Sequence, residues 1–295
     1  MVDTTVKTII NQISKHLESL YDSKLQRETV AWWFLEGVTK KSKTRLIVDI
    51  FITLSPAQQK QLSEWITLHT EHHYPLQYLL GFVPFGPLEI LVEAPILIPR
   101  PETEEWCASL ISYLEPVAKQ PLRILDMCTG SGCLALWFAK AFSNSTVYGV
   151  DISDSALALA EKNAHHNTIT NVQFFKSDLF TILNKEAPFD LIITNPPYIS
   201  AHAWYDLSPT VANWEDRGAL VGGFRGTELI HQITVQTPNY LTKKSPLTLH
   251  GLPRLVMEIG YDQGPETEKL FIEAGFDKVK ILTDSAGRDR VVSGW

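Results

Sequence analysis

The chain has 295 residues, 44% of them apolar and 20% charged, a composition that excludes a disordered chain, a collagen-like fibre and a disulfide scaffold. At about 150 residues per domain, this length predicts two domains. Lys and Arg number 26 against 33 Asp and Glu, and the resulting net charge of −7 disfavours a protein held on nucleic acid mainly by phosphate contacts.

The acidic excess is confined to one part of the chain. Residues 1–100 carry ten basic and ten acidic side chains, whereas residues 101–295 carry sixteen and twenty-three. No apolar run reaches the roughly 18 residues that span a bilayer, and Met1–Thr5 lacks the pattern of a leader peptide. The cysteines form no CxxC pair and no disulfide framework (Cys107, Cys128 and Cys133). We therefore expect a soluble, cytoplasmic protein.

Residues 1–75 are predicted to form a small helical bundle, because apolar residues recur at spacings of three and four. Ser55 followed by Pro56 marks the start of one helix, with Leu62 on its inner face. His69 and His73 are four apart on this helix. Their order is not His-Glu-x-x-His and a third ligand is missing, so no metal site is predicted.

Residues 76–100 are predicted to form a β-hairpin that links two domains. Prolines and glycines bracket an alternating stretch that contains Leu88, Ile90 and Val92. In residues 101–295, short apolar runs then alternate with amphipathic helical stretches. This alternation is typical of an α/β fold with a doubly wound parallel sheet. The predicted strands include 123–125, 146–150, 172–175, 191–194 and 255–258.

A glycine-containing corner follows the first strand of this sheet. The sequence Asp126-Met127-Cys128-Thr129-Gly130-Ser131-Gly132 precedes an apolar helix, so a ligand could approach the backbone beside a helix N-terminus. The third glycine of the dinucleotide fingerprint is replaced, because Leu134 and Ala135 occupy its region. The corner alone is a weak signal.

Acidic residues also follow the next two strands. Asp151 lies 21 residues beyond Gly130, where a carboxylate can accept hydrogen bonds from both ribose hydroxyls, and Asp178 follows the third strand. Each aspartate could alternatively cap the helix after it. Because the carboxyl ends of parallel strands share one edge, we expect a nucleoside pocket there.

The fourth strand runs directly into Asn195-Pro196-Pro197-Tyr198. Two prolines fix this loop and remove two N–H donors, which leaves carbonyl oxygens and the Asn195 carboxamide available. The Asn195 oxygen and the Pro196 carbonyl can each accept one N–H of a planar amide or amine. Tyr198 offers a ring that can pack on that group.

This tetrapeptide resembles the loop of methyltransferases that act on planar nitrogens, either adenine N6 or glutamine N5. Two upstream blocks, Pro75–Gly81 and Leu97–Glu104, resemble those of the HemK-like release-factor glutamine methyltransferases. The resemblance covers nearly the whole chain and continues through Arg217–Leu220, Glu258–Gly260 and Gly287–Val292.

The resemblance implies a class I S-adenosylmethionine-dependent methyltransferase fold. It implies an enzyme that methylates the Gln of a Gly-Gly-Gln loop in peptide chain release factors. In this reading, residues 1–75 bind the substrate protein and residues 101–295 form the methyltransferase domain. It implies that catalysis uses Asn195, Pro196, Pro197 and Tyr198. The residues implied for S-adenosylmethionine are Asp126, Cys128, Thr129, Gly130, Ser131, Gly132, Asp151, Asp178, Leu179 and Asn195. Those implied for the substrate cleft are Arg100, Glu102, Thr103 and Glu104.

The sequence departs from the family pattern at two of these positions. The family usually has glycine where Cys128 stands, and often an aromatic residue where Leu179 stands. We expect cofactor binding to be retained, with an aliphatic contact replacing part of the adenine stacking.

Other functions remain open from the sequence. An adenine N6 methyltransferase would use the same loop chemistry, but the acidic excess disfavours a nucleic-acid substrate. The remaining alternatives are a glutamine methyltransferase of a ribosomal protein and a non-catalytic binding protein. We expect a monomer that binds a release factor and neither nucleic acid nor membrane.

Overall fold

The computed structural model describes residues 4–183 and 188–295, which divide into two compact units. Unit 1 comprises Met1–Gly81 together with Ser208–Trp214, and unit 2 comprises Phe82–Leu207 together with Glu215–Trp295. Residues 1–3 of the predicted helical domain lie outside the described residues. None of the helices in the described ranges is long and apolar enough to cross a membrane.

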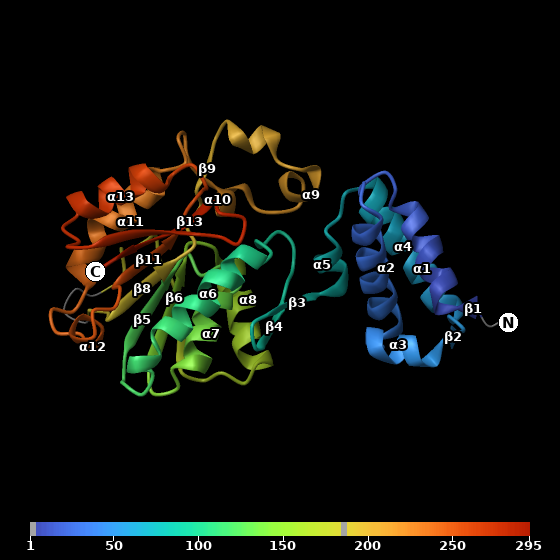
Figure 1. Cartoon of the computed structure of the whole chain (residues 1–295), viewed down its shortest axis with the longest axis horizontal. Helices are drawn as coiled ribbons and strands as arrows, with labels where there is room; N and C mark the ends of the chain where they lie inside the picture. The colour runs from blue at the N-terminus through green and yellow to red at the C-terminus, as the bar shows by residue number, and fades with distance from the viewer. Residues whose placement is uncertain (1–3, 184–187) are drawn as a thin grey trace. The chain divides into compact units, whose positions relative to one another are not determined.

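Residues 4–81 of unit 1 form a helical bundle, drawn in blue to teal in Figure 1. Its helices are α1 (Val6–His16), α2 (Lys24–Thr39), α3 (Lys43–Asp49), α4 (Pro56–Glu71) and α5 (Leu76–Leu80), with strand β1 (Thr4–Thr5) antiparallel to β2 (Phe51–Ile52). The core contains Leu17, Phe34, Leu35 and Leu46, all fully buried. Apolar residues at helical spacing thus form the predicted bundle.

Helix α4 begins where the sequence predicts. The Ser55 hydroxyl accepts a hydrogen bond from the Gln58 backbone N–H (3.2 Å), and the Gln58 side chain accepts one from the Ser55 N–H (2.9 Å). His69 on the same helix is a buried core residue. Its Nε2 lies 2.9 Å from the Tyr21 hydroxyl and its Nδ1 lies 2.8 Å from the Tyr74 carbonyl, and burial lowers its pKa.

A segment distant in sequence completes unit 1. Residues 208–214 contain helix α9 (Pro209–Ala212) and end at Trp214. The Trp214 ring meets the Tyr74 ring edge-on at 4.5 Å between centroids, and its Nε1 donates to the His72 carbonyl (3.0 Å).

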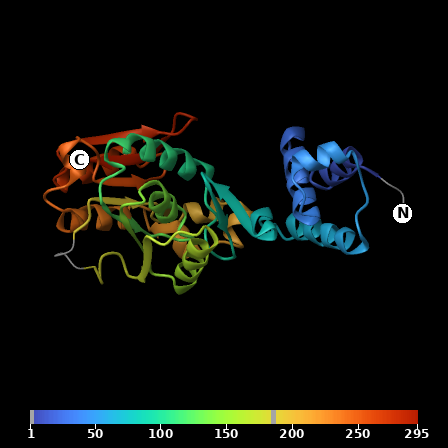
Figure 2. The same cartoon turned by 90° about the horizontal axis from the view of Figure 1, so that it is seen from below.

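The predicted hairpin segment begins with a helix rather than a strand. Helix α5 buries Leu76 and Tyr78 and ends at Leu80, where Gly81 follows with a φ of 84°. Five residues are too few for periodicity to distinguish a helix from a strand. The hairpin itself is formed by β3 (Phe82–Phe85) and β4 (Leu88–Leu91) and belongs to unit 2 (Figure 2).

Unit 2 is built on a seven-stranded sheet of order β12-β13-β11-β8-β5-β6-β7. The strands are β5 (Arg123–Met127), β6 (Thr146–Asp151), β7 (Val172–Lys176), β8 (Leu191–Thr194), β11 (Leu255–Glu258), β12 (Val279–Thr283) and β13 (Asp289–Gly294). Strands β5, β6, β7, β8 and β11 are parallel, as predicted, whereas β13 runs antiparallel to both β11 and β12. An apolar run reveals burial but not direction, so the sequence did not predict this reversal.

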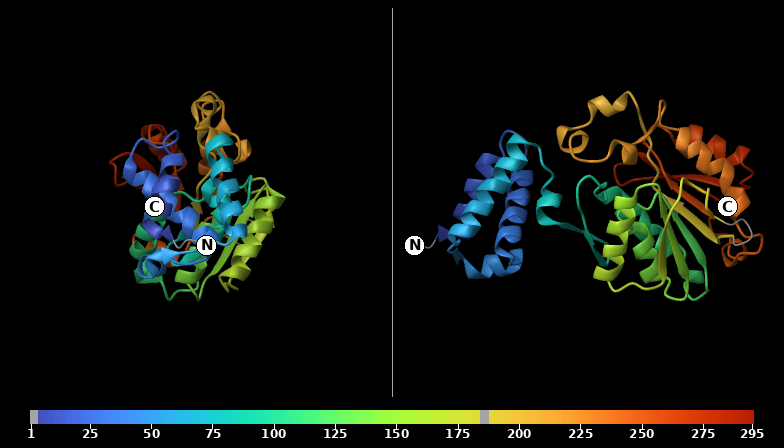
Figure 3. Two further views of the ribbon diagram at one scale, coloured as in Figure 1. Left: turned by 90° about the vertical axis from the view of Figure 1, so that its right-hand side faces the viewer. Right: turned by 180° about the vertical axis from the view of Figure 1, so that it is seen from behind.

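Helices cover both faces of this sheet (Figures 1 and 3). Helices α6 (Pro101–Tyr113), α7 (Cys133–Ala141) and α8 (Asp154–His166) lie on one face, and α11 (Glu228–Gln236) and α13 (Gly264–Glu273) lie on the other. The elements that connect them are β9 (Ile199–Ser200), β10 (Val221–Gly223), α10 (Arg217–Leu220), α12 (Pro246–Leu249) and the 3₁₀ helices Glu115–Val117, Ala203–Asp206 and Thr237–Tyr240. This is the doubly wound architecture expected from the sequence.

Candidate functional site

A cavity of about 340 Å³ opens at the carboxyl ends of the central parallel strands. This is the edge where open α/β sheets bind ligands. The predicted site residues that line it are Cys128, Gly130, Asp151, Asp178, Leu179, Asn195 and Pro197. The fold therefore gathers residues from the ends of β5, β6, β7 and β8 around one space.

The corner after β5 brings backbone to the cavity wall. Gly130 has a φ of 55°, and a Cβ added to its Cα would meet no atom within 4 Å. Its lack of a side chain therefore suits the backbone angle and leaves the space in front of it open. Cys128 also has a positive φ, 60°.

Asp126 lies beneath this corner, fully buried, and does not line the cavity. Its Oδ2 accepts hydrogen bonds from the Thr129 hydroxyl (2.6 Å) and the Ala135 N–H (3.1 Å). Its Oδ1 has no partner in the described part of the chain. Burial raises the pKa of Asp126 to about 7. Thr129, Ser131 and Gly132 do not line the cavity either, so these four residues shape the corner from behind.

Asp151 faces the cavity at the end of β6. Its Oδ2 accepts from the Gly130 N–H (2.9 Å) and its Oδ1 accepts from the Ser153 N–H (3.0 Å), which fixes the carboxylate in place. Burial raises its pKa, while these backbone hydrogen bonds oppose the shift. Each oxygen retains a lone pair for a ligand hydroxyl.

The segment after β7 supplies a polar and an apolar residue to the same wall. Asp178 is exposed, whereas Leu179 is buried with a φ of 47°. Leu179 belongs to the same buried apolar cluster as Phe180 and Tyr240, whose rings stack at 4.4 Å between centroids. Leu179 therefore presents apolar surface to the cavity from the packed core.

The Asn195–Tyr198 loop is held from several sides. Asn195 and Pro197 line the cavity, whereas Pro196 and Tyr198 do not. Gln263 donates to the Tyr198 carbonyl (2.8 Å). Gly222 lies so close that any side chain there would collide with the Pro197 carbonyl oxygen, so only glycine fits behind the loop.

A buried carboxylate lies next to this loop. Glu258, at the end of β11, accepts hydrogen bonds from the Thr103 hydroxyl and the Trp106 indole on Oε2, both at 2.7 Å, and from the Tyr198 hydroxyl on Oε1 at 3.2 Å. The Asn195 Nδ2 in turn donates to the Thr103 hydroxyl oxygen (3.3 Å). Burial raises the pKa of both Glu258 and Tyr198.

The residues predicted for a substrate cleft are separated in the structure. Arg100 forms a two-pronged ion pair with the buried Glu215 at 2.8 and 2.7 Å. Glu104 accepts from the Gly86 N–H in the hairpin turn (2.9 Å), Glu102 lines a different cavity, and Thr103 is buried. None of these four side chains lines the cavity described above.

Comparison with known proteins identifies the two parts of the chain. Residues 8–81 match the model of the PrmC N-terminal domain, and residues 107–210 match that of the Methyltransferase small domain. A release factor glutamine methyltransferase of Lactococcus lactis is 35% identical over 263 residues, covering 89% of this chain and 91% of the relative. The enzyme of the same name from Geobacter sulfurreducens is 30% identical over 294 residues, covering 98% and 96%.

The chain belongs to the release factor glutamine methyltransferase family. Among solved structures, a SAM-dependent methyltransferase from Agrobacterium tumefaciens matches with a TM-score of 0.50 at 16% identity, covering 72% of this chain and 69% of that one. This likeness concerns the fold, which is the class I methyltransferase sheet.

Both departures from the family pattern fall at positive φ. Cys128 occupies a left-handed position where the family usually has glycine, and Leu179 occupies another. Burial raises the pKa of the Cys128 thiol, which keeps it neutral.

Glu258 stands in a block of the family resemblance but was given no role from the sequence, and Glu215 was not singled out at all. Glu258 ends an apolar strand, Leu255-Val256-Met257, at the same sheet edge as the other site residues. The charged residue at the end of this apolar strand was the available signal for a site. Burying a charge without hydrogen-bonding partners is costly, so such a residue indicates that partners surround it.

Proposed function

We propose that this protein transfers a methyl group from S-adenosylmethionine to the side-chain amide nitrogen, N5, of the Gln in the Gly-Gly-Gln motif of a peptide chain release factor. The observation that carries this proposal is that Asn195 and Asp151 face one cavity at the carboxyl edge of the sheet. A nucleoside-binding carboxylate and a carboxamide that can hold a planar amide therefore share one wall. The names of the relatives favour a release factor over a nucleic acid or a ribosomal protein.

The cavity has the donors, acceptors and apolar surface that S-adenosylmethionine requires. The two oxygens of Asp151 are fixed by backbone N–H groups and can accept from both ribose hydroxyls. Leu179 and Ile152 offer apolar surface for the adenine, and Asp178 can accept from its amino group. When bound, S-adenosylmethionine supplies an electrophilic methyl group on a sulfonium. Of the other residues expected to bind it, Asp126, Thr129, Ser131 and Gly132 would act by shaping the loop that Cys128 and Gly130 present.

The Asn195–Tyr198 loop prepares the substrate nitrogen. An amide nitrogen is a poor nucleophile because its lone pair is delocalised into the carbonyl. The Asn195 Oδ1 and the Pro196 carbonyl accept its two N–H groups, while the Tyr198 ring packs on the amide. Alignment of this kind can contribute about 7–11 kcal/mol. These acceptors also stabilise the positive charge that grows on nitrogen during transfer. The methylated nitrogen becomes neutral again by losing one of its two N–H protons, so no strong base is needed before transfer.

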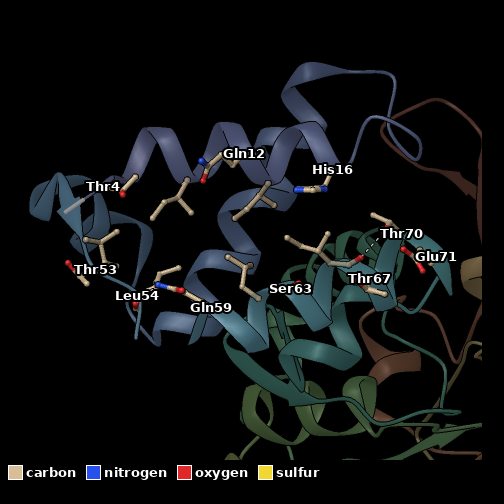
Figure 4. A pocket seen from close by; sticks show the side chains of 15 residues that line it. Thr4, Gln12, His16, Thr53, Leu54, Gln59, Ser63, Thr67, Thr70 and Glu71 are labelled. Atoms are coloured by element: carbon tan, nitrogen blue, oxygen red, sulfur yellow. Dashed lines mark hydrogen bonds between the residues drawn. The ribbon is translucent and has the colours of Figure 1, made fainter. Parts of the chain in front are cut away.

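The helical unit is the proposed contact for the release factor. A cavity of about 610 Å³ lies between α1 and α4. Its lining combines apolar side chains such as Ile9, Ile13 and Ile66 with polar ones that include Gln12, His16, Gln59, Ser63 and Thr67 (Figure 4). A lining of this type suits a reversible protein contact. The acidic excess of residues 101–295 argues against a nucleic-acid partner. We infer a monomer that acts in the cytoplasm, where release factors work.

Mass spectrometry of a release factor provides the direct test. The purified protein is incubated with S-adenosylmethionine and an intact factor, and the Gly-Gly-Gln peptide is analysed. We expect a mass increase of one methyl group on Gln. A factor whose Gln is changed to Glu serves as the control. Methylation of DNA, RNA or a ribosomal protein instead would contradict the proposal.

Two variants separate chemistry from cofactor binding. Asn195→Ala removes an acceptor for the substrate amide, so we expect kcat to fall at least about 100-fold. Its affinity for S-adenosylhomocysteine, measured by calorimetry, should stay within about threefold. Asp151→Ala should instead weaken that affinity about 10- to 100-fold, because two charge-assisted hydrogen bonds are lost. An equal loss of affinity in both variants would contradict these roles.

A further inference from the structure

We propose that Glu258 and Thr103 form a buried relay that fixes the orientation of the Asn195 carboxamide and the Tyr198 ring, which makes both of them positioning residues for methyl transfer. This inference rests on the proposed function, because it assigns the control of the same loop. It gives Thr103 a role different from the expected one of lining the substrate cleft.

The relay begins at a carboxylate that is almost completely enclosed. Glu258 is 1% exposed and lies at the end of β11, which pairs with β8, the strand that leads into Asn195. Its three side-chain partners, Thr103, Trp106 and Tyr198, can all donate. Three donors that converge on one carboxylate stabilise its ionised form against the burial that raises its pKa, and they hold it in a single position.

The single hydroxyl proton of Thr103 determines which groups donate and which accept in the relay. A threonine hydroxyl has one proton, and the short 2.7 Å bond to the Glu258 carboxylate uses it. The Thr103 oxygen can then only accept in its 3.3 Å contact with Asn195, so the Asn195 group that faces it must be Nδ2. The negative charge of Glu258 thereby selects which end of the Asn195 carboxamide faces Thr103.

The consequence for the substrate follows from the planarity of the carboxamide. With Nδ2 directed at Thr103, Oδ1 is on the opposite edge and is available to accept an N–H. In the flipped orientation, the NH₂ group would meet a substrate N–H donor to donor, and Oδ1 would meet the Thr103 lone pairs. The relay thus excludes the unproductive orientation.

The second arm acts on the other end of the loop. The Tyr198 hydroxyl donates to Oε1 of the same carboxylate at 3.2 Å, which limits rotation of the ring. Gln263 holds the Tyr198 carbonyl at 2.8 Å, so both the backbone and the ring of this residue are fixed. One carboxylate therefore controls the first and last residues of the tetrapeptide.

Substitutions at Thr103 test the relay while Glu258 stays in place. Thr103→Val keeps the shape and removes the hydroxyl, whereas Thr103→Ser keeps the hydroxyl and removes a methyl group. We expect Thr103→Val to lower kcat for the release factor at least about tenfold with KM within about threefold, because the amide is misoriented rather than absent. Thr103→Ser should restore kcat to within about threefold of the natural protein.

A matched control is Thr234→Val. Thr234 is as buried as Thr103 and lies in the same unit, and its hydroxyl donates to the Ile230 carbonyl within α11. Its replacement should leave kcat unchanged, while its effect on the unfolding temperature measures the general cost of losing a buried hydroxyl. A kcat loss in Thr234→Val equal to that in Thr103→Val would overturn the proposal.

A readout independent of turnover is the NMR signal of the Asn195 side-chain amide. In the natural protein and in Thr103→Ser, one Nδ2 hydrogen should show the downfield shift of a hydrogen-bonded proton. This shift should be lost in Thr103→Val, while S-adenosylhomocysteine affinity stays within about threefold. An unchanged Asn195 signal or an unchanged kcat in Thr103→Val overturns the relay.

The same readout separates this inference from the proposed function. If the natural protein methylates no release factor, the proposed function fails. The Asn195 signal still decides whether Thr103 orients the carboxamide.

Discussion

At the residue scale, two cavity residues hold backbone angles that side chains rarely adopt. Cys128 has a φ of 60° and Leu179 has a φ of 47°. The left-handed region costs an L-residue about 1–2 kcal/mol relative to glycine, because its Cβ approaches the following carbonyl. Such strain persists only where the surrounding structure enforces it, and here both residues lie on the wall of the cavity.

The left-handed backbone at Cys128 predicts which of two variants, Cys128→Gly or Cys128→Ala, is the more stable. Glycine normally destabilises a structured position by about 0.5–1 kcal/mol relative to alanine, because it gains more freedom on unfolding. At Cys128 the left-handed penalty on alanine offsets this difference. We therefore expect Cys128→Gly to unfold at a temperature equal to or above that of Cys128→Ala, as measured by calorimetry.

The control for this order is Cys107, which is buried in helix α6. There, the glycine variant should be less stable than the alanine variant by about 1 kcal/mol. If the glycine variant is less stable than the alanine variant at Cys128 as well, the backbone angle of Cys128 does not impose the strain we infer.

At the element scale, the corner between β5 and α7 depends on a buried carboxyl group. The pKa of Asp126 is raised to about 7, whereas an unfolded chain gives about 4. A raised pKa means that the folded state favours the protonated form. The stability that Asp126 contributes is thus fully present below about pH 4 and is lost as the pH rises through about 7.

Asp126→Asn removes this titration and keeps an oxygen that can accept from Thr129 and Ala135. We therefore expect the unfolding temperature of the variant, relative to the natural protein without ligand, to rise between about pH 5 and pH 8. Thermal unfolding at both pH values checks this. Parallel curves for the two proteins would show that Asp126 does not titrate in this range.

The strands that carry the site residues explain which part of the site could be predicted from the sequence. Asp151, Asp178 and Asn195 each follow a strand directly, and parallel strands bring their carboxyl ends to one edge, so their grouping could be predicted. The role of Glu258 could not, because its partners Thr103, Trp106 and Tyr198 are 155, 152 and 60 residues away. Hydrogen bonds at such separations depend on how helices pack, which periodicity does not encode.

The fold, too, could be predicted only where it depends on local sequence patterns. Apolar runs predicted the central strands and the helical bundle, but the antiparallel direction of β13 and the helix at Leu76–Leu80 needed the structure. The contact of Arg100 with Glu215, 115 residues later, was equally hidden. Sequence patterns report burial and local geometry, whereas direction and pairing are set by tertiary packing.

At the scale of the whole molecule, the helical unit gives a prediction about substrate binding. Ser63 is exposed on α4 and lines the cavity between α1 and α4. Ser63→Trp should fill this space and raise KM for the release factor at least about fivefold. It should leave kcat and the affinity for S-adenosylhomocysteine unchanged, because the lost contact stabilises the bound release factor and the transition state equally.

Glu64→Trp is the matched control, since Glu64 is the exposed neighbour of Ser63 and does not line the cavity. Steady-state kinetics with the intact factor distinguish the two variants. An equal KM in Ser63→Trp and the natural protein would argue against this surface as the contact.

The division of the chain has a consequence for its dissection into parts. The backbone passes between the two units at residues 81/82, 207/208 and 214/215, so a single cut cannot release either of them whole. A fragment starting at Phe82 would keep every strand of the large sheet but would also carry residues 208–214 without Tyr74 and His72, the partners of Trp214. The Trp214 ring would then be open to water. The difference in fluorescence between this fragment and its Trp214→Phe variant would report whether the missing helices, added separately, reassemble with the fragment.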